Sequence, residues 1–141
     1  MTDFIDQVDK SFLAQKWRLT TGVRNIVEIL NKTNIPLTVR NIEKKLDLKE
    51  RSIDPTTVYR ILERLKKAKL IHDLHGKFIK CSDHNNKHEH HFLLCEKCGR
   101  AEEIFLDYRE SISKQLAKEK NFILSEVNLS FRGICKDCTQ K

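Results

Sequence analysis

Two cysteine pairs constrain the fold of this chain more than any other feature. Cys95 and Cys98 are separated by two residues, and so are Cys135 and Cys138 near the C-terminus. Zinc takes four tetrahedral ligands, and this spacing lets one turn of backbone present both sulfurs of a pair to the same ion. The sequence therefore predicts that a structural Zn²⁺ bound by four cysteines closes the second half of the chain into one unit.

The alternative is that the pairs form disulfides or a redox Cys-x-x-Cys motif. The N-terminal residues include acids and lack the apolar stretch of a signal peptide, and no segment has the roughly 20 apolar residues of a membrane span. We therefore expect a cytoplasmic protein without a membrane partner, and reduced thiols there favour metal over disulfide. A closed four-cysteine site has no open coordination position, so its role is structural. Gly99 and Gly133 offer the backbone freedom that tight knuckles need.

The first half has the pattern of a winged helix-turn-helix. Three segments have apolar residues at helical spacing: 20–30, 39–46 and 55–65. Each has a side chain that can cap its start: Thr20, Thr38 and Asp54. The pattern then changes to two strands, 70–74 and 77–81, with a tight turn at His75-Gly76 between them. Three helices followed by a hairpin are typical of DNA-binding domains, and the net charge of +7 suits a polyanionic partner.

The second half is predicted to be an α/β unit. Strands are expected at about 88–94, 101–105 and 122–131, and a helix at about 107–118. The predicted fold class is therefore α+β. A winged helix-turn-helix domain over residues 1–81 is followed by a polar hinge at 82–87 and by a small metal-binding dimerisation domain over 88–141.

The start of the third predicted helix carries side chains that can read DNA. Thr57, Tyr59 and Arg60 lie where a helix-turn-helix faces base edges; arginine pairs with guanine and an aromatic ring packs on a thymine methyl. Basic side chains around it would contact phosphates: Arg18, Arg51, Arg64, Lys66, Lys67 and Lys69. Alternatively, each of these cations belongs to the solvated face of an ordinary amphipathic helix.

All six histidines lie between residues 72 and 91, with a fifth cysteine among them. His72 and Cys81 fall on the two strands of the predicted hairpin, and His88 opens the next strand. A site using these three residues would span the hinge, completed by a carboxylate from the second half. Sulfur, imidazole and carboxylate ligands suit zinc better than iron or manganese. Individual histidines in a turn-rich segment are also commonly no more than polar surface.

Four segments together resemble the ferric uptake regulator family of metal-dependent repressors, over nearly the whole chain. They are Arg18-Leu-Thr20 with Arg24, Thr57-Val-Tyr-Arg60, the histidine strand that leads into Cys95-x-x-Cys98-Gly99, and Gly133-Ile-Cys135-x-x-Cys138. Within the family the resemblance is closest to the zinc uptake regulators.

This resemblance implies a regulatory zinc site made by His72, Cys81, His88 and Glu103. The spacing from His72 to Cys81 is shorter than the family pattern, which leaves His75 as a competitor, and His84 is another candidate ligand.

The resemblance also implies an auxiliary metal site. Its members would be Glu89, His91 and Glu110, without the histidine that the last strand usually contributes. His90 is either an auxiliary ligand or simply exposed.

The hypothesis is a homodimeric, zinc-responsive transcriptional repressor of metal-uptake genes. Zinc would close the hinge and set two recognition helices at the spacing of a palindromic double-stranded operator, which the resemblance implies is rich in A and T. One rival is an iron- or peroxide-responsive regulator of the same family. Another is a zinc-dependent hydrolase, but that needs an open coordination position and a general base, and no motif supplies them. We therefore expect no enzyme activity and no small organic substrate.

Overall fold

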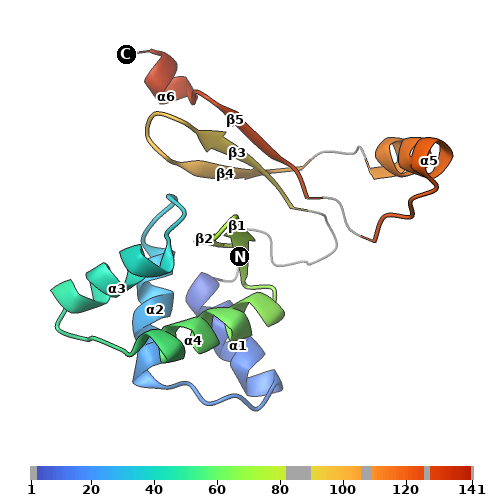
Figure 1. The fold of residues 1–141 in the computed structure, drawn as a ribbon. Helices are drawn as coiled ribbons and strands as arrows, with labels where there is room; N and C mark the ends of the chain where they lie inside the picture. The colour runs from blue at the N-terminus through green and yellow to red at the C-terminus, as the bar shows by residue number, and fades with distance from the viewer. Residues whose placement is uncertain (1–2, 82–89, 106–108, 126–127, 141) are drawn as a thin grey trace. The chain divides into compact units, whose positions relative to one another are not determined.

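The chain folds into two compact units, Met1–His84 and Asn85–Lys141 (Figure 1). The computed structural model describes residues 3–81, 90–105, 109–125 and 128–140. Within these residues, the first unit consists of helices and a hairpin, and the second of a small sheet with two helices. No helix in the described part of the chain is long and apolar enough to cross a membrane.

The first unit is a winged helix-turn-helix. Its elements are α1 (Phe4–Ala14), α2 (Thr21–Asn31), α3 (Val39–Leu48), α4 (Pro55–Lys67), β1 (Ile71–Leu74) and β2 (Lys77–Lys80). The three helices predicted from the sequence are α2, α3 and α4, and each begins at the predicted cap. The Val23 amide donates to Thr20 (3.2 Å), the Thr57 amide donates to Asp54 (3.1 Å), and Thr38 forms a capping box with α3.

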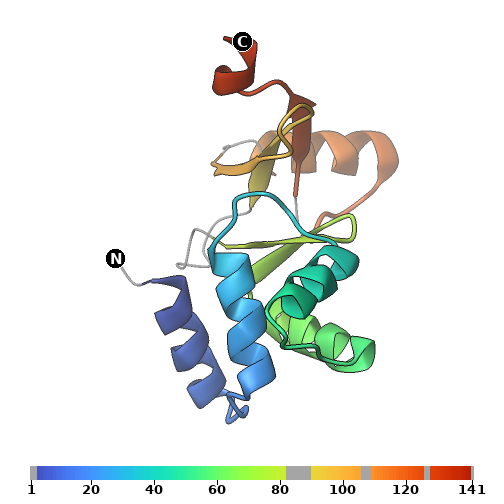
Figure 2. The same ribbon diagram turned by 90° about the vertical axis from the view of Figure 1, so that its left-hand side faces the viewer.

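Helix α1 is an element that we did not predict. Its residues Phe4, Val8 and Phe12 are four apart, so they lie on one helix face, and all three are buried. The ring of Phe12 meets that of Trp17 edge to face, with centroids 5.4 Å apart and an interplanar angle of 82°. Figure 2 shows α1 beside α2, so the predicted three-helix core is a four-helix core.

The hairpin is the predicted wing, and backbone and side-chain contacts attach it to the helical part of the unit. Its tight turn lies at His75-Gly76, where the sequence predicted it, and has left-handed φ at His75 (56°) and Gly76 (87°). The amides of Leu37 and Phe78 each donate to the other's carbonyl (2.9 and 2.7 Å), which joins the segment before α3 to β2. Lys80 donates from Nζ to the carbonyl of Asn31, at the C-terminus of α2 (2.7 Å).

The second unit has the predicted order of strand, strand, helix, strand. Its elements are β3 (His91–Cys95), β4 (Ala101–Ile104), α5 (Arg109–Lys120), β5 (Ser130–Gly133) and α6 (Lys136–Thr139). The sheet order is β4-β3-β5, with β4 antiparallel and β5 parallel to β3. The bounds expected for the last strand, 122–131, are wrong, because among the described residues it pairs with β3 over Ser130–Gly133. Helix α6 was not predicted.

The second unit buries few apolar side chains. Its buried described residues are His91, Phe92, Cys95, Ala101 and Cys138. Its exposed large apolar residues are more numerous: Leu93, Phe105, Phe122, Ile123, Phe131 and Ile134. A unit of this size needs a metal, a partner or both to hold its fold.

Candidate metal centres and nucleic-acid interface

Two backbone turns bring the four cysteines of the paired motifs together. Cys95 ends β3, and the left-handed Gly99 (φ 78°) turns the chain back towards β4, as we expected from its position. Cys135 is the N-cap of α6, and Cys138 lies within that helix. The parallel pairing of Cys95 with Gly133 places the two turns side by side. Gly133 itself has no left-handed φ, so the freedom expected of it is not used.

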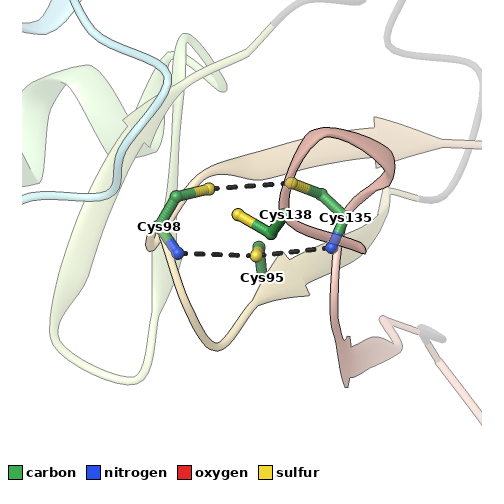
Figure 3. Close-up of side chains that lie close together, drawn as sticks. All are labelled: Cys95, Cys98, Cys135 and Cys138. Atoms are coloured by element: carbon green, nitrogen blue, oxygen red, sulfur yellow. Dashed lines mark hydrogen bonds between the residues drawn. The ribbon is translucent and has the colours of Figure 1, made fainter. Parts of the chain in front are cut away.

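The sulfur geometry fits one tetrahedral zinc ion (Figure 3). The four Sγ atoms all lie within 4.8 Å of one another, and those of Cys98 and Cys135 are 3.8 Å apart. Four sulfurs at about 2.3 Å from a tetrahedral Zn²⁺ are about 3.8 Å from each other. None of the five cysteines forms a disulfide, and all five are among the described residues. The predicted structural zinc site therefore has its donor set in place.

Backbone amides polarise this cluster. The amides of Cys98 (3.5 Å) and Cys135 (3.4 Å) both donate to Cys95 Sγ, and these hydrogen bonds lower the pKa of the Cys95 thiol to about 6. A hydrogen bond to Cys135 and burial raise the pKa of Cys138 to about 12. Without metal the cluster thus shares protons unevenly among its thiols. A bound Zn²⁺ requires thiolates, so its binding releases the remaining protons.

The wing carries a second pair of soft donors, His72 and Cys81. His72 is opposite Ile79 in the hairpin, and Cys81 follows Ile79 by two residues, so the side chains of His72 and Cys81 lie on the same hairpin face. The Cys81 amide donates to the carbonyl of Leu70 (2.8 Å), which holds Cys81 in line with β2. Cys81 is buried and His72 is half-buried. This is an imidazole and sulfur pair on a rigid support.

The second unit contains a histidine and carboxylate pair. His90 hydrogen-bonds through Nδ1 to Glu103 Oε1 on β4, and the exposed fractions of their side chains are 15% and 4%. Glu103 is opposite Phe92 in the β3–β4 ladder, and His90 shares the face of Phe92. His90, whose role we had left open, therefore contacts Glu103. The predicted ligand His88 and the alternative His84 lie outside the described residues.

The structure does not assemble the auxiliary site among the residues it describes. His91 is buried, and its Nδ1 accepts a hydrogen bond from the Leu129 amide (3.1 Å). Glu110 is exposed on α5 and pairs with Lys114 (2.8 Å). Neither belongs to a group of three or more metal-binding side chains in the described part of the chain. Glu89 lies outside those residues.

Helix α4 presents the predicted DNA-reading side chains to solvent. Tyr59 is 55% exposed and Arg60 is exposed, whereas four apolar residues form the opposite, buried face: Val58, Ile61, Leu62 and Leu65. Thr57 is half-buried, and its hydroxyl donates to Asp54 (2.6 Å), so it also serves the helix cap. Arg18 is exposed in the segment between α1 and α2.

The side chain of Arg51 has a hydrogen-bond partner within the protein. This residue was predicted to contact phosphate, but its guanidinium donates to the side chain of Asn25 on α2 (2.9 Å).

Comparison with known proteins gives one consistent result. The model of the ferric uptake regulator family matches residues 14–132. The ferric uptake regulation protein of Bacillus subtilis is 27% identical over 146 aligned positions, which cover 100% of this chain and 98% of that protein. The peroxide-responsive repressor PerR of Staphylococcus epidermidis is 23% identical and covers 88% of this chain and 83% of its own length.

Solved structures with the same fold include two zinc uptake regulators. Holo XcZur has a TM-score of 0.77 at 26% identity, covering 98% of each chain. A zinc uptake regulator complexed with zinc and DNA has a TM-score of 0.83 at 21% identity, covering 99% of this chain and 97% of its own. The predicted fold class is confirmed.

Proposed function

Because the chain belongs to the ferric uptake regulator family, we propose that it is a zinc-responsive repressor that binds operator DNA as a homodimer. The family comprises metal-responsive DNA-binding transcription regulators rather than enzymes. The proposal therefore concerns which metal this chain senses, through which residues, and with what effect on DNA.

The observation that carries the proposal is the chemistry of the two donor pairs outside the four-cysteine site. His72 and Cys81 share one face of the wing, and His90 contacts Glu103 in the second unit. Each pair supplies two ligands, and zinc in a closed site takes four. We propose that one regulatory zinc takes His72, Cys81 and Glu103, with a histidine from the start of β3 as its fourth ligand. That histidine is His88, as the sequence predicts, or His90.

The sulfur of Cys81 favours zinc over iron or manganese as the sensed metal. Thiolate is a soft ligand, whereas the sites of the two competing metals are richer in oxygen and nitrogen. The two solved zinc uptake regulators support this choice, while the curated ferric uptake and peroxide-responsive relatives keep the iron or peroxide alternative open. The metal dependence of DNA binding decides between them.

Zinc acts on DNA binding only if it binds one arrangement of the two units better than another. Ligands drawn from the wing and from β3 and β4 would tie the domain over residues 1–81 to the domain over 88–141 across the hinge at 82–87. We propose that this sets the two α4 helices of a dimer about 34 Å apart, the spacing of half-sites in a palindromic operator. Tyr59 and Arg60 then read bases, and Arg18 contacts phosphate, in an A/T-rich site.

The surface of the second unit supports a second copy of the chain as the partner. Strand β5 is an exposed edge strand of the described sheet; Phe131 within it and Ile134 directly after it are 44% and 42% exposed. Ile123 is 90% exposed. An edge strand with apolar neighbours is a surface that proteins cover by pairing. The dimer would act in the cytoplasm, where the operator and the regulated metal pool are found.

The test measures DNA binding as metals are titrated. A duplex is first selected from a random library by the zinc-loaded protein, and its binding is then followed with Zn²⁺, Fe²⁺ and Mn²⁺ added to protein that retains only the structural zinc. We expect zinc to raise affinity most, and Cys81→Ser to reduce the zinc effect by more than about tenfold. His88→Ala and His90→Ala identify the fourth ligand.

His75→Ala tests the competing ligand of the wing turn: because His75 is exposed, we expect this variant to respond to zinc as the parent does. Affinity that does not change when the regulatory metal is removed would refute the sensor. Activation by iron alone, with Cys81 dispensable, would instead establish the iron-responsive alternative.

A further inference from the structure

A row of residues on α2 contacts the turn that precedes the recognition helix α4. The row is Gly22, Asn25 and Glu28, which are three residues apart and so lie along one side of α2. The turn between α3 and α4 contacts this α2 row in reverse order, through Ile53, Arg51 and Lys49. The turn thus runs antiparallel to α2 along half the length of the helix.

The first contact depends on the missing side chain of Gly22. A Cβ built at Gly22 would lie 3.2 Å from Cδ1 of Ile53 in the turn and 3.5 Å from Cδ1 of Ile61 in the middle of α4. Ile53 therefore packs directly against the backbone of α2, next to the buried face of α4.

The central contact is polar and partly buried. Arg51 donates from Nη1 to Oδ1 of Asn25 (2.9 Å), and Asn25 is only 7% exposed. The Arg51 amide donates to the carbonyl of Leu46 at the end of α3 (2.9 Å), so its backbone is held as well. A charged donor on a buried oxygen makes a stronger hydrogen bond than a neutral donor, and its loss leaves that oxygen unsatisfied.

The third contact is weak. Glu28 lies 3.6 Å from Nζ of Lys49 and 3.8 Å from Nη1 of Arg51, and it also pairs with Lys32 (2.9 Å). The hydrogen bond from Lys32 contributes most to the lowered pKa of Glu28. These pairs are solvent-exposed, where ion pairs contribute little. The position of the turn therefore depends mainly on Ile53 and on the Arg51–Asn25 hydrogen bond.

We propose that Arg51 is a positioning residue for DNA recognition, acting through Asn25 rather than through a phosphate. This inference rests on the proposed function. The hydrogen bond fixes the turn against α2, and the turn sets where α4 begins and where Tyr59 and Arg60 point. Because the Arg51 side chain is still 51% exposed, a direct phosphate contact is the competing explanation, and the two roles have different signatures.

The experiment compares four single variants and the Arg51→Met/Asn25→Ala double variant of the full-length, zinc-loaded protein. Arg51→Met and Asn25→Ala each remove the hydrogen bond, Asn25→Asp keeps an acceptor in its place, and Arg64→Met removes an exposed cation of α4 as a phosphate-contact control. Binding to the selected duplex and to a scrambled duplex of the same composition is measured over a range of salt concentrations.

We expect Arg51→Met and Asn25→Ala each to lower affinity for the selected duplex about tenfold, with little change for the scrambled duplex. The salt dependence should match the parent, the double variant should lose no more than either single variant, and Asn25→Asp should bind like the parent. A phosphate contact predicts otherwise. Arg51→Met would then weaken both duplexes and reduce the salt slope by about one, as Arg64→Met should, while Asn25→Ala would bind normally. That result would overturn the inference.

Hydrogen exchange of the DNA-free protein separates this inference from the proposed function. In Arg51→Met and Asn25→Ala, amides of residues 49–60 should exchange about tenfold faster than in the parent or in Asn25→Asp, with the centre of α2 unchanged. Unchanged exchange over 49–60 overturns the positioning role. A parent protein that selects no duplex from the library would refute the repressor function, and exchange would still decide the role of Arg51 in the turn.

Discussion

Replacing Phe12 by alanine tests whether α1 belongs to the winged-helix core. Phe12 is fully buried, and Phe→Ala substitutions in cores cost about 3–5 kcal/mol, of which its edge-to-face contact with Trp17 supplies about 0.5–1.5 kcal/mol. The first unit spans Met1–His84, a size at which 1 kcal/mol shifts the melting temperature by about 4–8 °C. We therefore expect its melting temperature to fall by at least about 12 °C.

The assay follows the fluorescence of Trp17, the chain's single tryptophan, with circular dichroism as a second probe because the mutation alters the surroundings of that ring. Leu13→Ala is the matched control: it removes a large apolar side chain from the next position on α1, but Leu13 is 79% exposed, so its effect should stay within about 0.5 kcal/mol. If the two variants lose equal stability, α1 is not part of the core. If Phe12→Ala unfolds the unit, the operator affinity of the protein should fall in proportion to the folded fraction.

Three further predictions concern pH, zinc and the wing. Burial lowers the pKa of His91 from 6.5, and the Leu129 amide donates to its unprotonated Nδ1. The stability that neutral His91 contributes is therefore complete above pH 6.5 and is lost as pH falls below that value. His91→Gln should make the urea midpoint of the second unit depend less on pH between 7.5 and 5.5, if zinc is retained. Cys98→Ser should release the structural zinc, measured by metal analysis, and unfold the second unit while the Trp17 transition of the first stays in place; full zinc retention would contradict the four-cysteine site. In Gly76→Ala, the added Cβ has no atom within 4 Å, but the residue must adopt φ near 87°. The substitution should therefore destabilise the first unit by about 1 kcal/mol through backbone strain alone. Unchanged stability in urea unfolding would mean that the turn relaxes.

The parts of the fold that local chemistry determines were predictable from the sequence. The starts of α2, α3 and α4 follow from one cap residue each, and the wing turn follows from glycine. Helix α1 was missed because Asp6 and Asp9 interrupt its apolar residues, although the spacing of four between Phe4, Val8 and Phe12 was a usable signal. The error in β5 has another cause. Residues 122–125 are apolar enough for a strand, but pairing is decided by β3, which is distant in sequence; among the described residues, its backbone hydrogen bonds to this segment begin at Leu129.

The candidate sites divide in the same way. The four-cysteine cluster follows from spacing, because each pair is local and the only long-range step is the pairing of β3 with β5. Strand alternation gives His88 and His90 the same face, so the sequence does not decide which contacts Glu103; within the described residues, His90 does. The partner of the Arg51 side chain could not be predicted from the sequence for a different reason. An arginine in a turn looks like a phosphate ligand until a buried acceptor such as Asn25 is placed beside it.

The proposed metal on the hairpin would influence α4 through hydrogen bonds to other parts of the helical core, as well as through the ion pair of Lys66 on α4 with Asp73 on β1 (3.5 Å). Lys80 bonds the carbonyl of Asn31 at the C-terminus of α2, and the mutual hydrogen bonds of Leu37 and Phe78 hold β2 to the segment before α3. The α2 row lies on the same helix as Asn31 and contacts the turn before α4 through Arg51. A helix transmits displacement along its axis because its backbone hydrogen bonds resist local bending. The proposed metal ligation at the wing would therefore have a hydrogen-bonded route to the turn before the recognition helix, whereas the four-cysteine site, closed within the second unit, has the chemistry of a permanent scaffold.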